Sequence, residues 1–135
     1  MTLLIDANII LDVLMNRKEF VKESAIIWKL CETEQFKGYV STLTFVNMMY
    51  IMRKELTSEK IEEVLQKLKL IFEFVDFSSS ILEKAVEMKW KDFEDAIQSA
   101  TAEQIYADYI ITRNVRDFAK SKVMAFTPSE LLARI

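Results

Sequence analysis

LLIDANIILDVL, residues 3–14, is the stretch that determines how the rest of the chain is interpreted. It begins with a short apolar run that ends at Asp6, as a buried β-strand does where it reaches the edge of a sheet. The apolar residues that follow are spaced for a helix near residues 8–16, which also carries Asp12. Ionised carboxylates are rarely buried without partners, so Asp6 calls for a functional explanation. For Asp12 we expect a structural role, either a polar contact to a neighbouring loop or a solvated position.

Short apolar runs continue to alternate with helical segments along the chain. We predict further strands at YVST (39–42), IFEFVDF (71–77), DYIIT (108–112) and KVMAFT (122–127), with helical segments between them. Such alternation implies right-handed βαβ crossovers and a parallel sheet that is covered on both faces. We therefore predict one domain over residues 1–135, a three-layer α/β/α fold with a central parallel sheet of about five strands.

The composition excludes several kinds of chemistry. The chain has no histidine, one cysteine and one glycine, which removes imidazole bases, multi-cysteine metal sites and Gly-rich phosphate loops. The net charge of −3 gives no overall attraction to nucleic acid. The longest weakly polar stretch, residues 40–52, is too short and too polar to span a membrane, and no signal peptide is recognisable, so we expect a cytoplasmic location. Carboxylate chemistry with a hard metal ion remains.

Acidic side chains stand where the strands of the predicted sheet end. Asp6 ends the first strand, Asp117 follows the fourth strand by one short turn, and Asp95 lies in the first turn of the helix before that strand. Each acid alone has an ordinary structural explanation as a turn or helix-capping residue. If the first and fourth strands are neighbours in the sheet, the three acids converge on one rim. There they would repel one another unless a cation such as Mg²⁺ or Mn²⁺ neutralised them.

Three segments resemble a known family: LLIDANIILDVL, DFEDAIQSATA (92–102) and YIITRNVRDF (109–118). In this order and spacing they resemble the PIN domain, the fold of metal-dependent ribonucleases that includes the VapC-type toxins of bacterial toxin–antitoxin pairs. The resemblance implies a Mg²⁺- or Mn²⁺-dependent endoribonuclease that cleaves single-stranded RNA and acts as the toxin of such a pair. Its expected partners are RNA, a protein antitoxin and a second copy of the chain in a homodimer, with no membrane partner.

The resemblance also assigns site residues. Asp6, Asp95 and Asp117 match the catalytic, metal-binding aspartates of the family. Asn47 stands where many PIN nucleases have a glutamate, and we expect it to offer a neutral oxygen to the metal. The resemblance also matches Asn8, Thr112 and Asn114 to polar positions that orient the acids or contact the phosphate. Beyond the resemblance, we expect Asp92 to assist at the metal or the substrate. We expect phosphate contacts from Arg113, Arg116 and Lys91.

Two other functions stay open on the sequence alone. A PIN-like domain that has lost the glutamate at position 47 could hold RNA or a protein without cleaving anything. A phosphoacceptor receiver domain is also doubly wound, and its acids would here be Asp6 and Asp76 at the ends of the first and third strands. Metal titration tests the first alternative, and labelling of Asp76 by acetyl phosphate tests the second.

Overall fold

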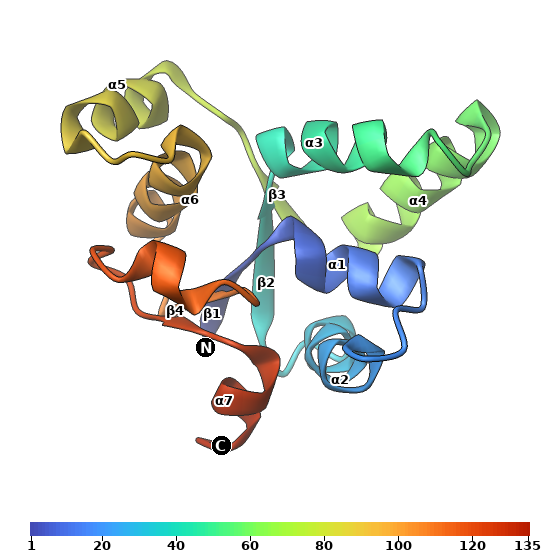
Figure 1. Ribbon diagram of the computed structural model, residues 1–135. Helices are drawn as coiled ribbons and strands as arrows, with labels where there is room; N and C mark the ends of the chain where they lie inside the picture. The colour runs from blue at the N-terminus through green and yellow to red at the C-terminus, as the bar shows by residue number, and fades with distance from the viewer.

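The structure is a computed structural model that describes residues 1–135, and its centre is a parallel sheet of five strands (Figure 1). The strands are β1 (Thr2–Ile5), β2 (Lys37–Ser41), β3 (Glu73–Val75), β4 (Tyr109–Ile111) and β5 (Ala125–Phe126), in the spatial order β3-β2-β1-β4-β5. The helices are α1 (Ala7–Leu14), α2 (Val21–Glu32), α3 (Thr42–Met52), α4 (Ser58–Ile71), α5 (Ser79–Met88), α6 (Phe93–Gln104) and α7 (Pro128–Leu132), with a 3₁₀ helix η1 (Val115–Phe118).

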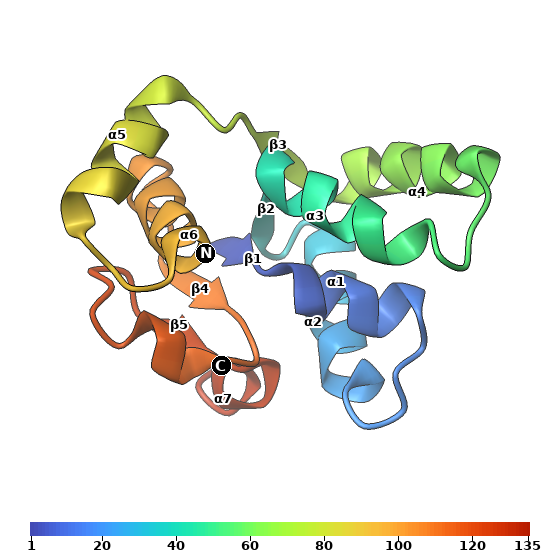
Figure 2. The same cartoon turned by 45° about the horizontal axis from the view of Figure 1, so that its top comes forward.

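Helices cover both faces of the sheet, because the central strands are apolar on both faces. In β1, Leu3 and Ile5 belong to the larger core, which is built with α1, α2, α3, α4 and α7. Leu4, on the opposite face of the strand, packs in a smaller core with residues of α6, β4 and η1. Figures 1 and 2 show the result, with α5 and α6 on one side of β1 and α1 to α4 on the other. The predicted three-layer α/β/α fold is confirmed.

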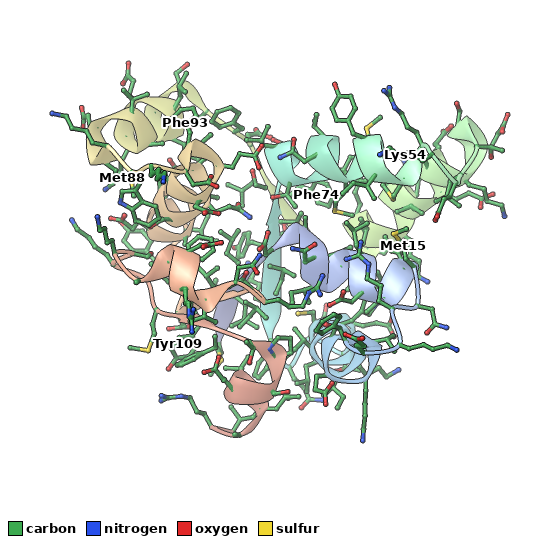
Figure 3. The ribbon with its side chains drawn as sticks, in the orientation of Figure 1. Met15, Lys54, Phe74, Met88, Phe93 and Tyr109 are labelled. Atoms are coloured by element: carbon green, nitrogen blue, oxygen red, sulfur yellow. The ribbon has the colours of Figure 1, made fainter.

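A side chain of β3 helps to attach α3 to the sheet. Phe74 lies beneath α3, where its ring centroid is 6.1 Å from that of Phe45 (Figure 3).

No helix of the structure is long and apolar enough to cross a membrane.

Polar side chains define where the helices begin. Asp92 accepts a hydrogen bond from the Asp95 backbone N–H at 3.1 Å and caps α6, as its sequence context predicts. Thr127 and Glu130 form a reciprocal capping box around Pro128 at the start of α7. Thr57 caps α4, because its hydroxyl accepts a hydrogen bond from the Lys60 backbone N–H at 3.3 Å.

The single glycine, Gly38 in β2, lies where the sheet meets α2 and α4 very closely. A Cβ atom at this position would lie 2.7 Å from the Cys31 sulfur and 2.8 Å from Cδ1 of Phe72, which is closer than side-chain carbons approach other atoms. Cys31 itself is buried, and its burial raises the pKa of the thiol to about 12. The thiol is therefore a core group rather than a nucleophile.

Candidate functional site

The site lies where the sheet order reverses between β1 and β4. The chain proceeds from β1 to β2 and β3 on one side and returns to β4 and β5 on the other. Ile5 pairs in register with Ile111, so Asp6 and Thr112 stand next to each other just beyond the carboxyl ends of the two strands. Crevices at such reversal points are where open α/β sheets bind ligands.

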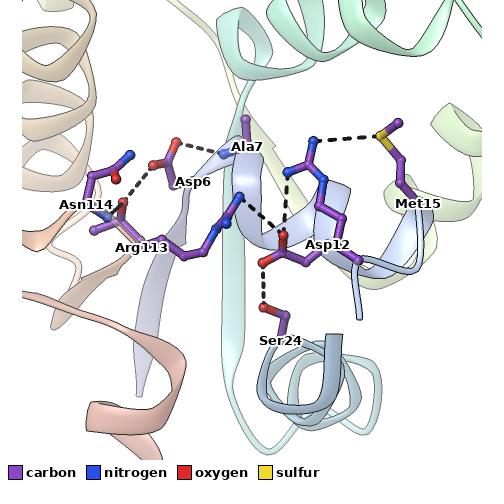
Figure 4. A network of polar contacts seen from close by, with 9 residues as sticks. Asp6, Ala7, Asp12, Met15, Ser24, Arg113 and Asn114 are labelled. Carbon is purple, nitrogen blue, oxygen red and sulfur yellow. Dashed lines mark hydrogen bonds and ion pairs between the residues drawn. The ribbon is translucent and has the colours of Figure 1, made fainter. Parts of the chain in front are cut away.

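The carboxylate of Asp6 is fixed from two sides (Figure 4). The Thr112 hydroxyl donates a hydrogen bond to Oδ2 at 2.8 Å, and the Ala7 backbone N–H donates to Oδ1 at 2.8 Å. Thr112 Oγ1 in turn accepts from the Asn114 backbone N–H at 3.0 Å, which ties the loop after β4 to the same point. Asp6 is therefore oriented by neutral donors and forms no ion pair.

A cavity of about 300 Å³ opens beside Asp6, and we call it the acid cavity. Its wall brings together four segments of the chain: the β1–α1 junction, α3, α6 with its cap, and η1 with the residue before it. All three aspartates assigned by the resemblance line it, and so do four of the other expected site residues. The polar and acidic lining residues are Asp6, Asn8, Thr44, Asn47, Asp92, Glu94, Asp95, Gln98, Asn114 and Asp117. No lysine or arginine lines it.

The other acids of this cavity raise the proton affinity of Asp95. The pKa of Asp95 is raised to about 7, first by burial and then by the negative charges of Asp92, Asp117, Asp6 and Glu94. Burial also raises the pKa of Asp6, although hydrogen bonds from Thr112, Ala7 and Gln98 and the charge of Arg113 act in the opposite direction. In the ion-free protein the cavity thus holds more carboxylates than it can easily keep ionised.

The donor set suits a hard cation. Carboxylate and amide oxygens are the ligands that Mg²⁺ and Mn²⁺ prefer. Gln98 adds an unused acceptor, because its Oε1 is buried without a hydrogen-bond partner. No three acidic side chains are close enough to form a ready-made ligand set in this structure, so a bound ion would require the carboxylates to draw together.

One of the two expectations for Asp12, a solvated position, was wrong. Its side chain is fully buried on α1, where it faces α2 and the loop after β4. It accepts a hydrogen bond from the Ser24 hydroxyl at 3.0 Å and pairs with Arg17 at 3.5 Å and Arg113 at 3.4 Å (Figure 4). The alternative expectation, a polar contact to a neighbouring loop, is confirmed because both arginines lie in loops.

The two arginines that were candidates for phosphate contact occupy different surroundings. Arg113 reaches away from the acid cavity to Asp12, and its guanidinium lies 3.9 Å from the centre of the Phe20 ring. It acts on Asp6 only through its charge. Arg116 is exposed on η1 and forms neither an ion pair nor a side-chain hydrogen bond.

Sequence reasoning did not include Gln98 and Glu94 among the site residues. Gln98 follows Asp95 by three residues on α6, a spacing that places both on one face of a helix, and this was the available signal. Glu94 precedes Asp95 in the first turn, where acidic residues are common for dipole reasons, so nothing in the sequence distinguished it.

Comparisons with known proteins identify the family. The family model described as PIN domain matches residues 2–116, and the chain belongs to this family. No curated protein sequence matches the chain significantly. Membership of the PIN family argues against a receiver domain. The strand order does so too, because β2 separates β1 from β3 and Asp76 does not line the acid cavity.

Several solved structures share the fold. A chain of a toxin–antitoxin complex from Klebsiella pneumoniae is 25% identical with a TM-score of 0.70, and the match covers 93% of this chain and 96% of that one. A chain of VapBC2 from Rickettsia felis, bound to a DNA fragment from its promoter, is 15% identical with a TM-score of 0.73 and coverage of 94% and 98%. A chain of FitAcB from Neisseria gonorrhoeae is 20% identical with a TM-score of 0.67 and coverage of 94% and 98%.

Proposed function

We propose that this protein is a Mg²⁺- or Mn²⁺-dependent endoribonuclease that hydrolyses phosphodiesters of single-stranded RNA. The observation that carries the proposal is the acid cavity, in which Asp6, Asp95 and Asp117 come from three separate segments and have no basic partner on the wall. Acids that a fold gathers without counter-charges are stable as an ionised group only with a cation. Membership of the PIN family supports the same conclusion.

Asp6, Asp95 and Asp117 would hold the ion, with Asn47 offering a neutral oxygen from α3. When bound, the ion would supply water activation for in-line attack and neutralisation of charge on the phosphoryl group. Thr112 and the Ala7 N–H keep the Asp6 carboxylate in one orientation. The lack of histidine agrees with a reaction in which no imidazole carries the proton.

We further propose that the nuclease is the toxin of a toxin–antitoxin pair and binds a protein antitoxin. The support is the set of structural neighbours, which by their descriptions include a toxin–antitoxin complex and a VapBC assembly. Copurification with the product of an adjacent small gene, followed by loss of cleavage in the complex, is the result expected. Unchanged cleavage in a saturated complex would contradict this role.

Cleavage of a labelled single-stranded RNA tests the nuclease proposal directly. We expect cleavage with Mn²⁺ or Mg²⁺, none with EDTA, and none for Asp6→Asn. Asp76→Asn is the matched control, because Asp76 is an exposed acid just beyond the end of another strand and lies outside the acid cavity. Equal activity of Asp6→Asn and the unmodified protein would contradict the proposal.

A second candidate is a PIN domain that binds RNA without cleaving it. The observation that favours it is Asn47, a neutral side chain on the wall of the acid cavity. This alternative predicts RNA binding without cleavage at any concentration of metal ion.

A further inference from the structure

A second cavity, of about 490 Å³, adjoins the acid cavity. The two share three acids on their common wall, Asp92, Asp95 and Asp117. The remaining wall of the second cavity differs in character, since it consists of Trp90, Lys91, Arg116, Ala119 and Lys120. We call it the basic cavity. Its volume falls within the range of about 300–1,000 Å³ that is usual for small-ligand sites.

The cations of the basic cavity are not used by the fold. Lys91, Arg116 and Lys120 are exposed, and none of them forms an ion pair or a side-chain hydrogen bond, although three acids line the same cavity. Arg17 and Arg113, by contrast, are both committed to Asp12. The unpaired cations are therefore free to contact an anionic ligand.

The cations approach from two sides. Lys91 belongs to the connection between α5 and α6, whereas Arg116 lies on η1 and Lys120 follows it. Trp90 precedes Lys91 in the α5–α6 connection and is half-buried, with its ring edge-on to Phe118 of η1 at a centroid distance of 6.5 Å. It packs against the smaller core that contains Leu4 and against a further cluster between α5 and α6, so its ring is held in place rather than free to turn. The buried residues of that cluster are Ile81, Ala85, Ala96, Ile97 and Ala100. A fixed aromatic wall beside phosphate-binding cations is a common arrangement for single-stranded nucleic acid.

The two cavities differ in charge, and this difference favours one placement of a bound polyanion over the other. A polyanion that crosses the acid cavity meets repulsion there, and the α3 wall of that cavity offers no cation to compensate it. Of the residues that line the two cavities, the cations lie on η1, just after it and on the α5–α6 connection. A phosphodiester chain is therefore best accommodated when the nucleotide next to the reacting phosphate lies in the basic cavity.

We propose that the basic cavity is a nucleotide subsite for single-stranded RNA, in which Lys91, Arg116 and Lys120 contact phosphate and Trp90 contacts the base. The inference rests on the proposed function, since it concerns the substrate of the same site. It assigns binding to Lys120 and Trp90, which had no role in the family resemblance. It assigns no phosphate contact to Arg113.

Fluorescence of Trp90 tests the subsite without cleavage. The chain has two tryptophans, and Trp28→Phe leaves Trp90 as the only one. A single-stranded RNA hexamer in EDTA and low salt is expected to quench this fluorescence. Anisotropy of a labelled hexamer with the unmodified protein measures the same affinity independently of Trp28→Phe.

Variants then identify the residues involved. Replacing Arg116 and Lys120 together by alanine should weaken binding and make the slope of log K against log salt shallower by about 1.4, since each lost contact to a single strand is worth about 0.7. Lys122→Ala is the matched control, because Lys122 is an exposed lysine nearby that does not line the basic cavity. An unchanged salt slope in the double variant, or an equal loss in Lys122→Ala, would overturn the subsite.

Three further results test this inference, and the last two separate it from the nuclease proposal. Hexaglutamate that binds as tightly as RNA, with the same dependence on Arg116 and Lys120, would mean that the basic cavity takes an acidic peptide and would overturn the RNA assignment. If RNA binding follows the prediction but no metal ion supports cleavage, the nuclease proposal fails and the subsite stands. If cleavage occurs and KM is unchanged in the double variant, the subsite fails and the nuclease stands.

Discussion

Asp6 and Asp12 lie on the same short segment, and the fold treats their charges in opposite ways. Asp12 is fully buried but has two guanidinium groups and a hydroxyl around its carboxylate. Asp6 is half-buried and receives hydrogen bonds only from neutral groups, with Asp95 and Asp117 lining the same cavity. The comparison shows that the protein itself neutralises Asp12, whereas Asp6 lines a cavity with no lysine or arginine on its wall, where we propose that a cation binds.

The largest expected difference is in catalysis. Asp6→Asn and Asp117→Asn should each reduce metal-dependent RNA cleavage by more than the roughly 10–100-fold that is lost when an outer partner of a metal ligand is removed. The fold should remain intact or become slightly more stable without metal, because one repelling acid is gone. RNA cleavage and thermal melting in EDTA measure the two effects. Full activity in either variant, or loss of cooperative melting, would contradict the assignment.

The next largest expected effect is on the free energy of unfolding. Asp12→Asn should lower it, whereas Asp6→Asn should leave it unchanged or raise it slightly. Asp12→Asn leaves Arg17 and Arg113 without their counter-charge. We expect a loss of about 2 kcal/mol, less than the roughly 3–5 kcal/mol for fully buried pairs because both arginines are partly exposed. Urea unfolding in EDTA, with Asp6→Asn as the comparison, measures it. A change below about 0.5 kcal/mol would mean that these pairs contribute nothing net.

A smaller effect concerns pH. The pKa of the Asp95 carboxyl is raised from 3.8, its ordinary value, to about 7 in the folded protein. Between these two pH values the folded state keeps a proton on Asp95 that the unfolded state has released. This contribution to stability is fully present below about pH 4 and is lost as the pH rises to about 7. Melting temperatures in EDTA between pH 4 and 8 should therefore fall less steeply for Asp95→Asn than for the unmodified protein. Parallel curves would show that Asp95 does not titrate in this range.

The smallest expected effect is at position 47. Asn47→Glu adds a charged oxygen to the wall of the acid cavity, and we expect divalent ions to bind several-fold more tightly. Calorimetric titration measures the affinity. An unchanged affinity would place Asn47 outside the metal site.

Local patterns made most of the fold predictable. The order of strands and helices follows from hydrophobic periodicity, and parallel pairing follows from their alternation. Asp6 and Asp117 were recognisable because each follows a strand closely in the sequence. The spatial order of the strands also matters, and it leaves Asp76 out of the site by placing β2 between β1 and β3.

The sequence could not predict features that depend on contacts between distant segments. The burial of Asp12 depends on Ser24 in α2 and on Arg113 after β4, and a single helix pattern carries no information about either. The separation of an acid cavity from a basic cavity likewise depends on how η1 and the α5–α6 connection pack beside α6. Gln98 and Trp90 became candidates only through that packing.

Titration of Mn²⁺ into the metal-free protein and its Asp6→Asn and Asp12→Asn variants tests the central claim most directly. We predict that the unmodified protein and Asp12→Asn, measured at a temperature where the latter is folded, bind Mn²⁺ with affinities within a few-fold of each other. Asp6→Asn should show no binding in the same range. Loss of binding in Asp12→Asn with retention in Asp6→Asn would contradict the account, because the metal would then depend on the acid that the protein neutralises with its own arginines.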